Sequence, residues 1–136
     1  MTISQSPQIF LIDDDNDLRH ALEQALELDG YEVMSFGRAA EALPQVHFQL
    51  FGVIVCDVRM PEMSGPDFLK KVIEIDPALP VIFITGHGDV AMAVSAMRDG
   101  AYDFIEKPFP TSQLSLVINR AVEKRRLVLE NRVLRE

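Results

Sequence analysis

Five short apolar segments, each followed by a stretch long enough for a helix, constrain the fold of this chain more than any other feature. The segments are Ile9–Ile12, Tyr31–Phe36, Val53–Cys56, Val81–Ile84 and Tyr102–Ile105. Most of them are apolar throughout, which is typical of strands covered on both faces. Apolar residues recur at helical spacing over 17–28, 39–46, 66–75, 90–97 and from 112 onward. This alternation predicts an α/β sandwich around a five-stranded parallel sheet. We expect helix caps at Ser64, Asp89 and Thr111 or Ser112.

Length and charge exclude several function classes. The chain has 136 residues, the size of one domain. Its net charge of −8 argues against nucleic acid as a direct partner, because binding to phosphates needs clustered Lys and Arg. The one cysteine, Cys56, excludes an internal disulfide and a cysteine zinc site, and we expect it to be buried. The chain has no long apolar run and no secretory signal, so we expect no membrane contact and a cytoplasmic location.

The last helical segment is unusually long. No Gly or Pro interrupts residues 112–136, so a helix of about 25 residues, near 37 Å, is possible. The pairs Val122 with Leu129 and Leu127 with Leu134 repeat at seven residues, which indicates a two-helix seam and a homodimer. The alternative is a frayed, solvent-exposed helix. We expect the basic run 124–126 to be a solvated face rather than a DNA contact.

Carboxylates follow two of the predicted strands. Asp13, Asp14 and Asp15 come directly after the first strand, and Asp57 comes after the third. In parallel sheets the ligand crevice lies beyond the carboxyl ends of the strands. Carboxylates crowded there would repel one another, so we expect a bound cation. Oxygen ligands favour Mg²⁺ at Asp13, Asp14 and Asp57, whereas Asp15 is expected to have a structural or capping role.

A hydroxyl and an ammonium lie at the ends of the fourth and fifth predicted strands. Thr85 ends the fourth apolar segment, and Lys107 follows the fifth. Asp57 could attack a phosphoryl group to form an acyl phosphate, while Thr85 and Lys107 compensate the charge on its oxygens. The residues therefore indicate phosphoryl transfer. His87 lies two positions beyond Thr85 and could contact the phosphoryl group or its attacking water.

The motifs at these strand ends resemble the receiver domain of bacterial two-component response regulators. They are Ile12-Asp13-Asp14-Asp15, Asp57-Val58-Arg59-Met60-Pro61 with Gly65, Ile84-Thr85-Gly86 and Lys107-Pro108-Phe109. More narrowly, 85–89 and 100–105 resemble the NtrC-type regulators that activate sigma-54 promoters. Residues 123–132 are similar to the linker of dicarboxylate-transport regulators.

This resemblance implies a flavodoxin-like three-layer sandwich with strand order 2-1-3-4-5 and an extended C-terminal helix. It implies a receiver domain over 1–122 and a linker helix over 123–136, leading to ATPase and DNA-binding output domains that this chain lacks. The receiver would take a phosphoryl group from a sensor histidine kinase and switch the oligomeric state or activity of a transcriptional activator. It would not be an enzyme beyond its own phosphorylation and dephosphorylation.

The resemblance also implies a role for each site residue. Asp57 would be the phosphoacceptor and would bind Mg²⁺ together with Asp14 and the backbone carbonyl of Arg59, with Asp13 helping through water. Thr85 and Lys107 would contact the phosphoryl group, and Phe104 would change rotamer. Arg59 and His87 are possible rate-tuning residues. The Lys107–Pro108 bond is a candidate cis peptide.

Four other interpretations compete with this one. A calcium loop starting at Asp13 would need Gly at position 18 and Glu at position 24, where the chain has Leu18 and Gln24. A mononucleotide binder would suffer repulsion between phosphate and the aspartates. A Mg²⁺-dependent phosphohydrolase or nuclease would need a second acidic residue beside Asp57, where Val58 and Arg59 stand. A phosphorylation-independent interaction module stays open.

Overall fold

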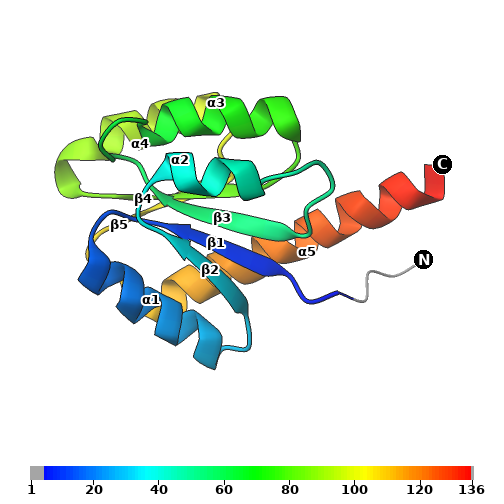
Figure 1. The fold of residues 1–136 in the computed structure, drawn as a ribbon, viewed down its shortest axis with the longest axis horizontal. Helices are drawn as coiled ribbons and strands as arrows, with labels where there is room; N and C mark the ends of the chain where they lie inside the picture. The colour runs from blue at the N-terminus through cyan, green and yellow to red at the C-terminus, as the bar shows by residue number, and fades with distance from the viewer. Residues whose placement is uncertain (1–4, 136) are drawn as a thin grey trace.

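A computed structural model describes residues 5–135 as one parallel sheet with helices on both faces (Figure 1). The strands are β1 (Gln8–Ile12), β2 (Glu32–Phe36), β3 (Gly52–Asp57), β4 (Val81–Thr85) and β5 (Asp103–Glu106). They lie in the order β2-β1-β3-β4-β5, and every neighbouring pair is parallel. The predicted sandwich, strand order and long C-terminal helix are confirmed.

Helices α1 and α5 cover one face of the sheet, and α2, α3 and α4 cover the other (Figure 1). Their bounds are α1 (Asn16–Leu28), α2 (Ala39–Ala42), α3 (Gly65–Ile75), α4 (Val90–Arg98) and α5 (Thr111–Arg135), with 3-10 turns η1 (Leu43–Gln45) and η2 (His87–Asp89). The helix expected over 39–46 ends early, because Pro44 has no N–H to continue the α-helical ladder. No helix within 5–135 is long and apolar enough to cross a membrane.

The helix caps agree only in part with expectation. Ser64 caps α3 by accepting a hydrogen bond from the Asp67 amide at 3.3 Å. Asp15 caps α1 in the same way, through the Leu18 amide at 3.1 Å. Asp89 precedes α4 but makes no capping bond, so the prediction was wrong there. Its carboxylate accepts hydrogen bonds from a distant arginine instead.

Two hydrophobic cores form, one on each face of the sheet. One face packs Phe10, Ile54 and Phe83 against α2, α3 and α4, and the other packs Ile9, Val55 and Ile82 against α1 and α5. All six residues of β3 are buried, including Cys56. The central strand is therefore covered on both sides, as its continuous apolar run predicts.

The carboxyl-terminal half of α5 packs on the domain more closely than its sequence indicates. Val122 and Leu129, expected on a dimer seam, lie buried in the core shared with β1 and β3. Leu127 and Leu134 are 60% and 72% exposed. Arg125, expected in solvent, is completely buried. Only the pair Leu127 and Leu134 therefore faces outward. α5 continues without interruption past residue 122, and residues beyond it still pack on the domain.

Candidate functional site

The carboxyl ends of β1 and β3 bring three aspartates together. Ile12 and Cys56 are paired in the register of these neighbouring strands, so the residues that follow them, Asp13 and Asp57, lie side by side. One carboxylate oxygen from each of Asp13, Asp14 and Asp57 lies within 4.8 Å of the others. Asp13 and Asp57 are buried and Asp14 is exposed. The sheet register thus creates the acidic cluster that the sequence predicts.

Asp13 is the most constrained of the three. Its Oδ1 accepts a hydrogen bond from the Asp15 amide at 2.9 Å, while its Oδ2 is buried without a hydrogen-bond partner. Burial raises the pKa of Asp13 from 3.8 to about 6, and the charges of Asp57 and Asp14 act in the same direction. A buried carboxylate oxygen that lacks a hydrogen-bond partner, beside two other carboxylates, favours binding of a cation there.

Lys107 supplies a positive charge from the far side of the cluster. Its Nζ lies 3.2 Å from Asp57 Oδ2 and 3.8 Å from Asp13 Oδ2. Burial would lower the pKa of Lys107, but the carboxylates of Asp13 and Asp57 outweigh it and the pKa is raised. The Lys107–Pro108 peptide bond is cis, as expected. One ammonium therefore faces both buried carboxylates of the cluster.

Arg59 is held at the site from two directions. Its backbone amide donates to Asp57 Oδ1 at 3.1 Å. Its Nε and Nη2 both donate to Asp89 Oδ1, at 3.0 and 2.7 Å. This pair links the loop after β3 to the start of α4. The sequence does not indicate the pair, because an acidic residue before a helix is normally a cap.

Thr85, Phe104 and His87, the remaining predicted residues, bond or pair with residues outside the acidic cluster. The Thr85 hydroxyl is buried and donates to the Gly86 carbonyl at 3.1 Å. Phe104 is half-buried on β5, paired with Phe83 of β4. His87 is exposed, with Nδ1 3.2 Å from Glu106 Oε1. The structure thus brings five of the predicted residues together, namely Asp13, Asp14, Asp57, Arg59 and Lys107.

Gly65 is a further residue that the site requires. A Cβ atom there would lie 2.6 Å from Phe83 Cε1 and 2.9 Å from Val58 Cα. The Gly65 amide donates to the Val58 carbonyl at 3.0 Å, so the loop after Asp57 folds directly back onto β3. Only glycine permits this close approach.

This fold and this arrangement of aspartates and lysine define a class of signalling domain. The family described as response regulator receiver domain matches residues 9–119. The chain belongs to this family.

The curated relatives of this chain belong to a narrower group within the receiver family. The chain is 53% identical to the C4-dicarboxylate transport transcriptional regulatory protein DctD of Rhizobium meliloti (strain 1021), over 98% of this chain and 29% of that protein. It is 52% identical to DctD of Pseudomonas aeruginosa, over 94% of this chain and 28% of that protein. The expected similarity to dicarboxylate-transport regulators is confirmed. The chain spans less than a third of the length of these two relatives.

Solved structures agree with this assignment. A response regulator receiver domain protein from Clostridium thermocellum superposes with a TM-score of 0.83 at 34% identity, over 90% of this chain and 98% of that one. NtrX from Brucella abortus, solved in complex with ADP, gives a TM-score of 0.84 at 34% identity, over 97% of this chain and 30% of that one. The match to NtrX includes most of α5.

Proposed function

We propose that this receiver domain takes a phosphoryl group from the phosphohistidine of a sensor histidine kinase onto Asp57, in a reaction that uses Mg²⁺. The observation that carries the proposal is the position of Asp57. Its carboxylate lies 3.2 Å from Lys107 Nζ and within 4.8 Å of a carboxylate oxygen of both Asp13 and Asp14. The nucleophile Asp57, the ammonium of Lys107 and the acidic oxygens that would hold a metal ion thus lie next to one another.

The residues present fit a magnesium ion. Mg²⁺ prefers oxygen ligands and usually keeps several waters, and Asp13 Oδ2 is a buried oxygen without a hydrogen-bond partner. Asp14, Asp57 and the backbone carbonyl of Arg59 would hold the ion, with Asp13 bonding to its water. When bound, the ion neutralises the charge that develops on the phosphoryl oxygens.

The transfer itself requires a carboxylate and a stabilised leaving group. A carboxylate oxygen of Asp57 attacks the phosphorus atom, and the phosphorus–nitrogen bond breaks with its electron pair going to the imidazole. The product is an acyl phosphate on Asp57. Lys107 keeps its proton through the reaction and stabilises one phosphoryl oxygen, because the neighbouring carboxylates raise its pKa. Thr85 would donate to another oxygen after leaving the Gly86 carbonyl.

Phosphorylation would then shift a two-state equilibrium toward a conformation in which Thr85 and Phe104 have moved. A shift from about 1% to 99% active requires roughly 5.5 kcal/mol of differential stabilisation. New charge-assisted hydrogen bonds to three phosphoryl oxygens are of the strength required. Arg59 and His87, which now pair with Asp89 and Glu106, are the proposed rate-tuning residues.

Labelling with a small phosphodonor tests the phosphoacceptor. Wild-type protein incubated with acetyl phosphate and Mg²⁺ should gain the mass of one phosphoryl group, and chelation of the metal should abolish the gain. Asp57→Asn should gain nothing. The matched control is Asp67→Asn on the exposed start of α3, which should label like wild type. Equal labelling of Asp57→Asn and wild type would refute the assignment.

Magnesium binding is tested separately with Asp14→Ala. Asp14 is exposed, so the variant should stay folded. Loss of the Asp14 carboxylate should weaken Mg²⁺ binding at least about tenfold. Calorimetric titration with Mg²⁺ measures this. Unchanged affinity would exclude Asp14 as a ligand while leaving Asp57 as the phosphoacceptor.

The output is proposed from the relatives. The two DctD proteins are named as transcriptional regulators of C4-dicarboxylate transport, and each is more than three times as long as this chain. We propose that the phosphorylated receiver controls a sigma-54-dependent activator in the cytoplasm, through ATPase and DNA-binding domains of the full-length protein. We also propose that it forms a homodimer through α5, at the exposed Leu127 and Leu134.

A further inference from the structure

A buried ionic cluster holds the end of α5 at the edge of the sheet opposite the phosphoacceptor. It consists of Asp76, Arg125 and Arg132, hereafter the Asp76 cluster. Asp76 and Arg125 are both fully buried. Arg125 Nη2 donates to Asp76 Oδ2 at 2.7 Å, and Arg132 donates from Nη1 and Nη2 to the two carboxylate oxygens, at 2.8 Å each. A single carboxylate thus binds two arginines that stand about two turns apart on α5.

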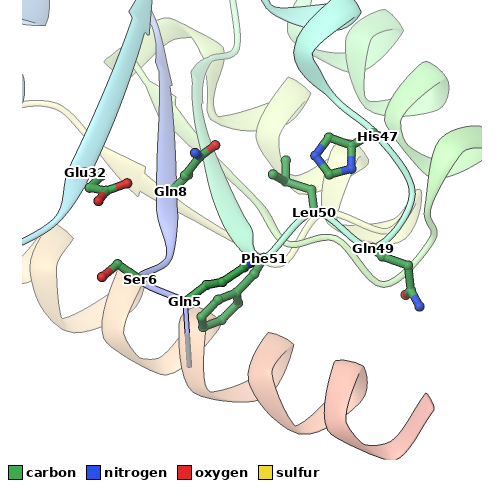
Figure 2. Close-up of a pocket in the computed structure, with 8 residues that line it drawn as sticks. All are labelled: Gln5, Ser6, Gln8, Glu32, His47, Gln49, Leu50 and Phe51. Carbon is green, nitrogen blue, oxygen red and sulfur yellow. The ribbon is translucent and has the colours of Figure 1, made fainter. Parts of the chain in front are cut away.

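Backbone groups of two loops complete the cluster. The Gln49 and Ala78 amides donate to Asp76 at 3.2 and 3.0 Å, and Arg125 Nε donates to the Leu50 carbonyl at 2.9 Å. Gln49, on the loop before β3, adopts a positive φ of 73°. Figure 2 shows Gln49, Leu50 and Phe51 on this loop, with α5 passing beneath it.

Aromatic contacts extend the same docked surface. The guanidinium of Arg132 lies 4.8 Å from the Phe48 ring centroid, and that of Arg126 lies 4.9 Å from the Phe51 centroid. Leu129, between the two clustered arginines, is buried in the core. The docked face therefore combines an apolar anchor with directional charged bonds, which set one register for the helix.

The cluster resists opening because its carboxylate and one of its two arginines are charged and fully buried. Burial would raise the pKa of Asp76, but hydrogen bonds from Arg132 and Arg125 outweigh it and hold this pKa well below its usual value. Arg125 Nη1 is buried without a hydrogen-bond partner, so the cluster has no spare acceptor. Removing one partner leaves a buried charge uncompensated, which is a strongly unfavourable change.

We infer that Asp76 anchors an intramolecular docking site for residues 123–135, which makes this helix extension part of the rigid receiver body rather than a flexible linker. α5 begins beside the site and runs to the opposite edge of the sheet (Figure 1). Because its end is fixed there, α5 moves as one rigid helix. The cluster also decides which face of the extension points outward, since Arg125, Leu129 and Arg132 face inward while Leu127 and Leu134 remain exposed.

Hydrogen exchange of the 136-residue protein tests this inference. Asp76→Asn and Arg132→Ala should each raise exchange of the amides of 123–130 at least about tenfold relative to those of 114–121 in the same helix. The matched control is Arg120→Ala, on the exposed side of α5, which should leave that ratio unchanged. The ratio separates local release of the extension from a general loss of stability.

Two results would overturn the inference. One is an unchanged ratio in Arg132→Ala, a variant expected to fold because this side chain is partly exposed. The other is an exchange ratio in Arg120→Ala that rises as much as in Arg132→Ala. Phosphodonor labelling of the same variants keeps this test apart from the proposed function, because labelling at Asp57 needs no part of the Asp76 cluster.

Discussion

At the scale of single residues, two aspartates on neighbouring strands have different chemistry because their surroundings differ. Asp57 has a hydrogen bond to each carboxylate oxygen, from the Arg59 amide and from Lys107. Asp13 has one oxygen without a hydrogen-bond partner, and its pKa is raised to about 6. The Asp57 carboxylate is therefore fixed by two donors, whereas the buried carboxyl of Asp13 favours its neutral form.

The raised pKa of Asp13 predicts a pH dependence. The folded state binds this proton more tightly than the unfolded state, so the contribution to stability is full below about pH 4 and is lost as pH rises through about 6. Each unit of pKa difference corresponds to about 1.4 kcal/mol. Without Mg²⁺, wild type should therefore lose more unfolding free energy between pH 4 and 7 than Asp13→Asn, as measured by urea denaturation. Adding Mg²⁺ at pH 7 should restore part of the unfolding free energy that wild type has lost. Equal changes of unfolding free energy with pH in wild type and Asp13→Asn would contradict the prediction.

Gly65 gives a steric prediction at the same scale. Gly65→Ala places a methyl group against the Phe83 ring and the Val58 backbone, and overpacking of this kind costs about 1–3 kcal/mol. Gly88→Ala is the matched control, because a Cβ there meets nothing within 4 Å. Thermal unfolding should show a lower Tm for Gly65→Ala alone. Equal Tm values for the two variants would show that the loop after β3 can move to accept a side chain.

At the scale of elements, the helices facing the site begin in different ways. At the start of α3 the Ser64 hydroxyl accepts a capping hydrogen bond from the Asp67 amide, whereas Asp89 at the start of α4 accepts hydrogen bonds from Arg59. The start of α3 is thus capped locally, whereas Asp89 at the start of α4 pairs with an arginine thirty residues away in sequence.

Ser64→Ala tests the local cap. The Asp67 amide loses its acceptor, and loss of a serine cap typically costs about 1 kcal/mol. Urea denaturation should show this loss, and Ser64→Asp should recover most of it because its carboxylate can accept the same bond. A stability of Ser64→Ala equal to wild type would mean that water replaces the cap at no cost.

At the scale of the whole molecule, we propose that two copies pair through the exposed leucines of α5, Leu127 and Leu134. Sedimentation of the 136-residue protein should show a dimer at micromolar concentration, and Leu127→Gln combined with Leu134→Gln should convert it to a monomer. Leu28→Gln is the matched control, an equally polar change at a leucine 89% exposed on α1. A shortened chain ending near Glu123 is unsuitable, because it removes Arg125 and Leu129 from the fold. A monomeric wild type at about 100 µM would rule out pairing through α5.

The sequence by itself determined the sheet and most of the candidate site. Continuous apolar runs predict buried parallel strands, and in such a sheet residues that follow neighbouring strands must lie together. The proximity of Asp13, Asp57 and Lys107 therefore follows from their positions along the chain. These predictions depend on periodicity and on strand order, which are properties of segments.

Only the tertiary structure decided the docking of the helix extension and the pairing of Arg59. Arg125 stands in a basic run that is normally solvated, yet it is buried because Asp76 and the Leu50 carbonyl, 49 and 75 residues away, meet it. Asp89 likewise stands at the start of α4 but makes no capping bond, and its carboxylate pairs instead with Arg59, 30 residues earlier. A charged side chain is buried only where a distant partner compensates its desolvation, and local sequence does not reveal which partner the fold will bring.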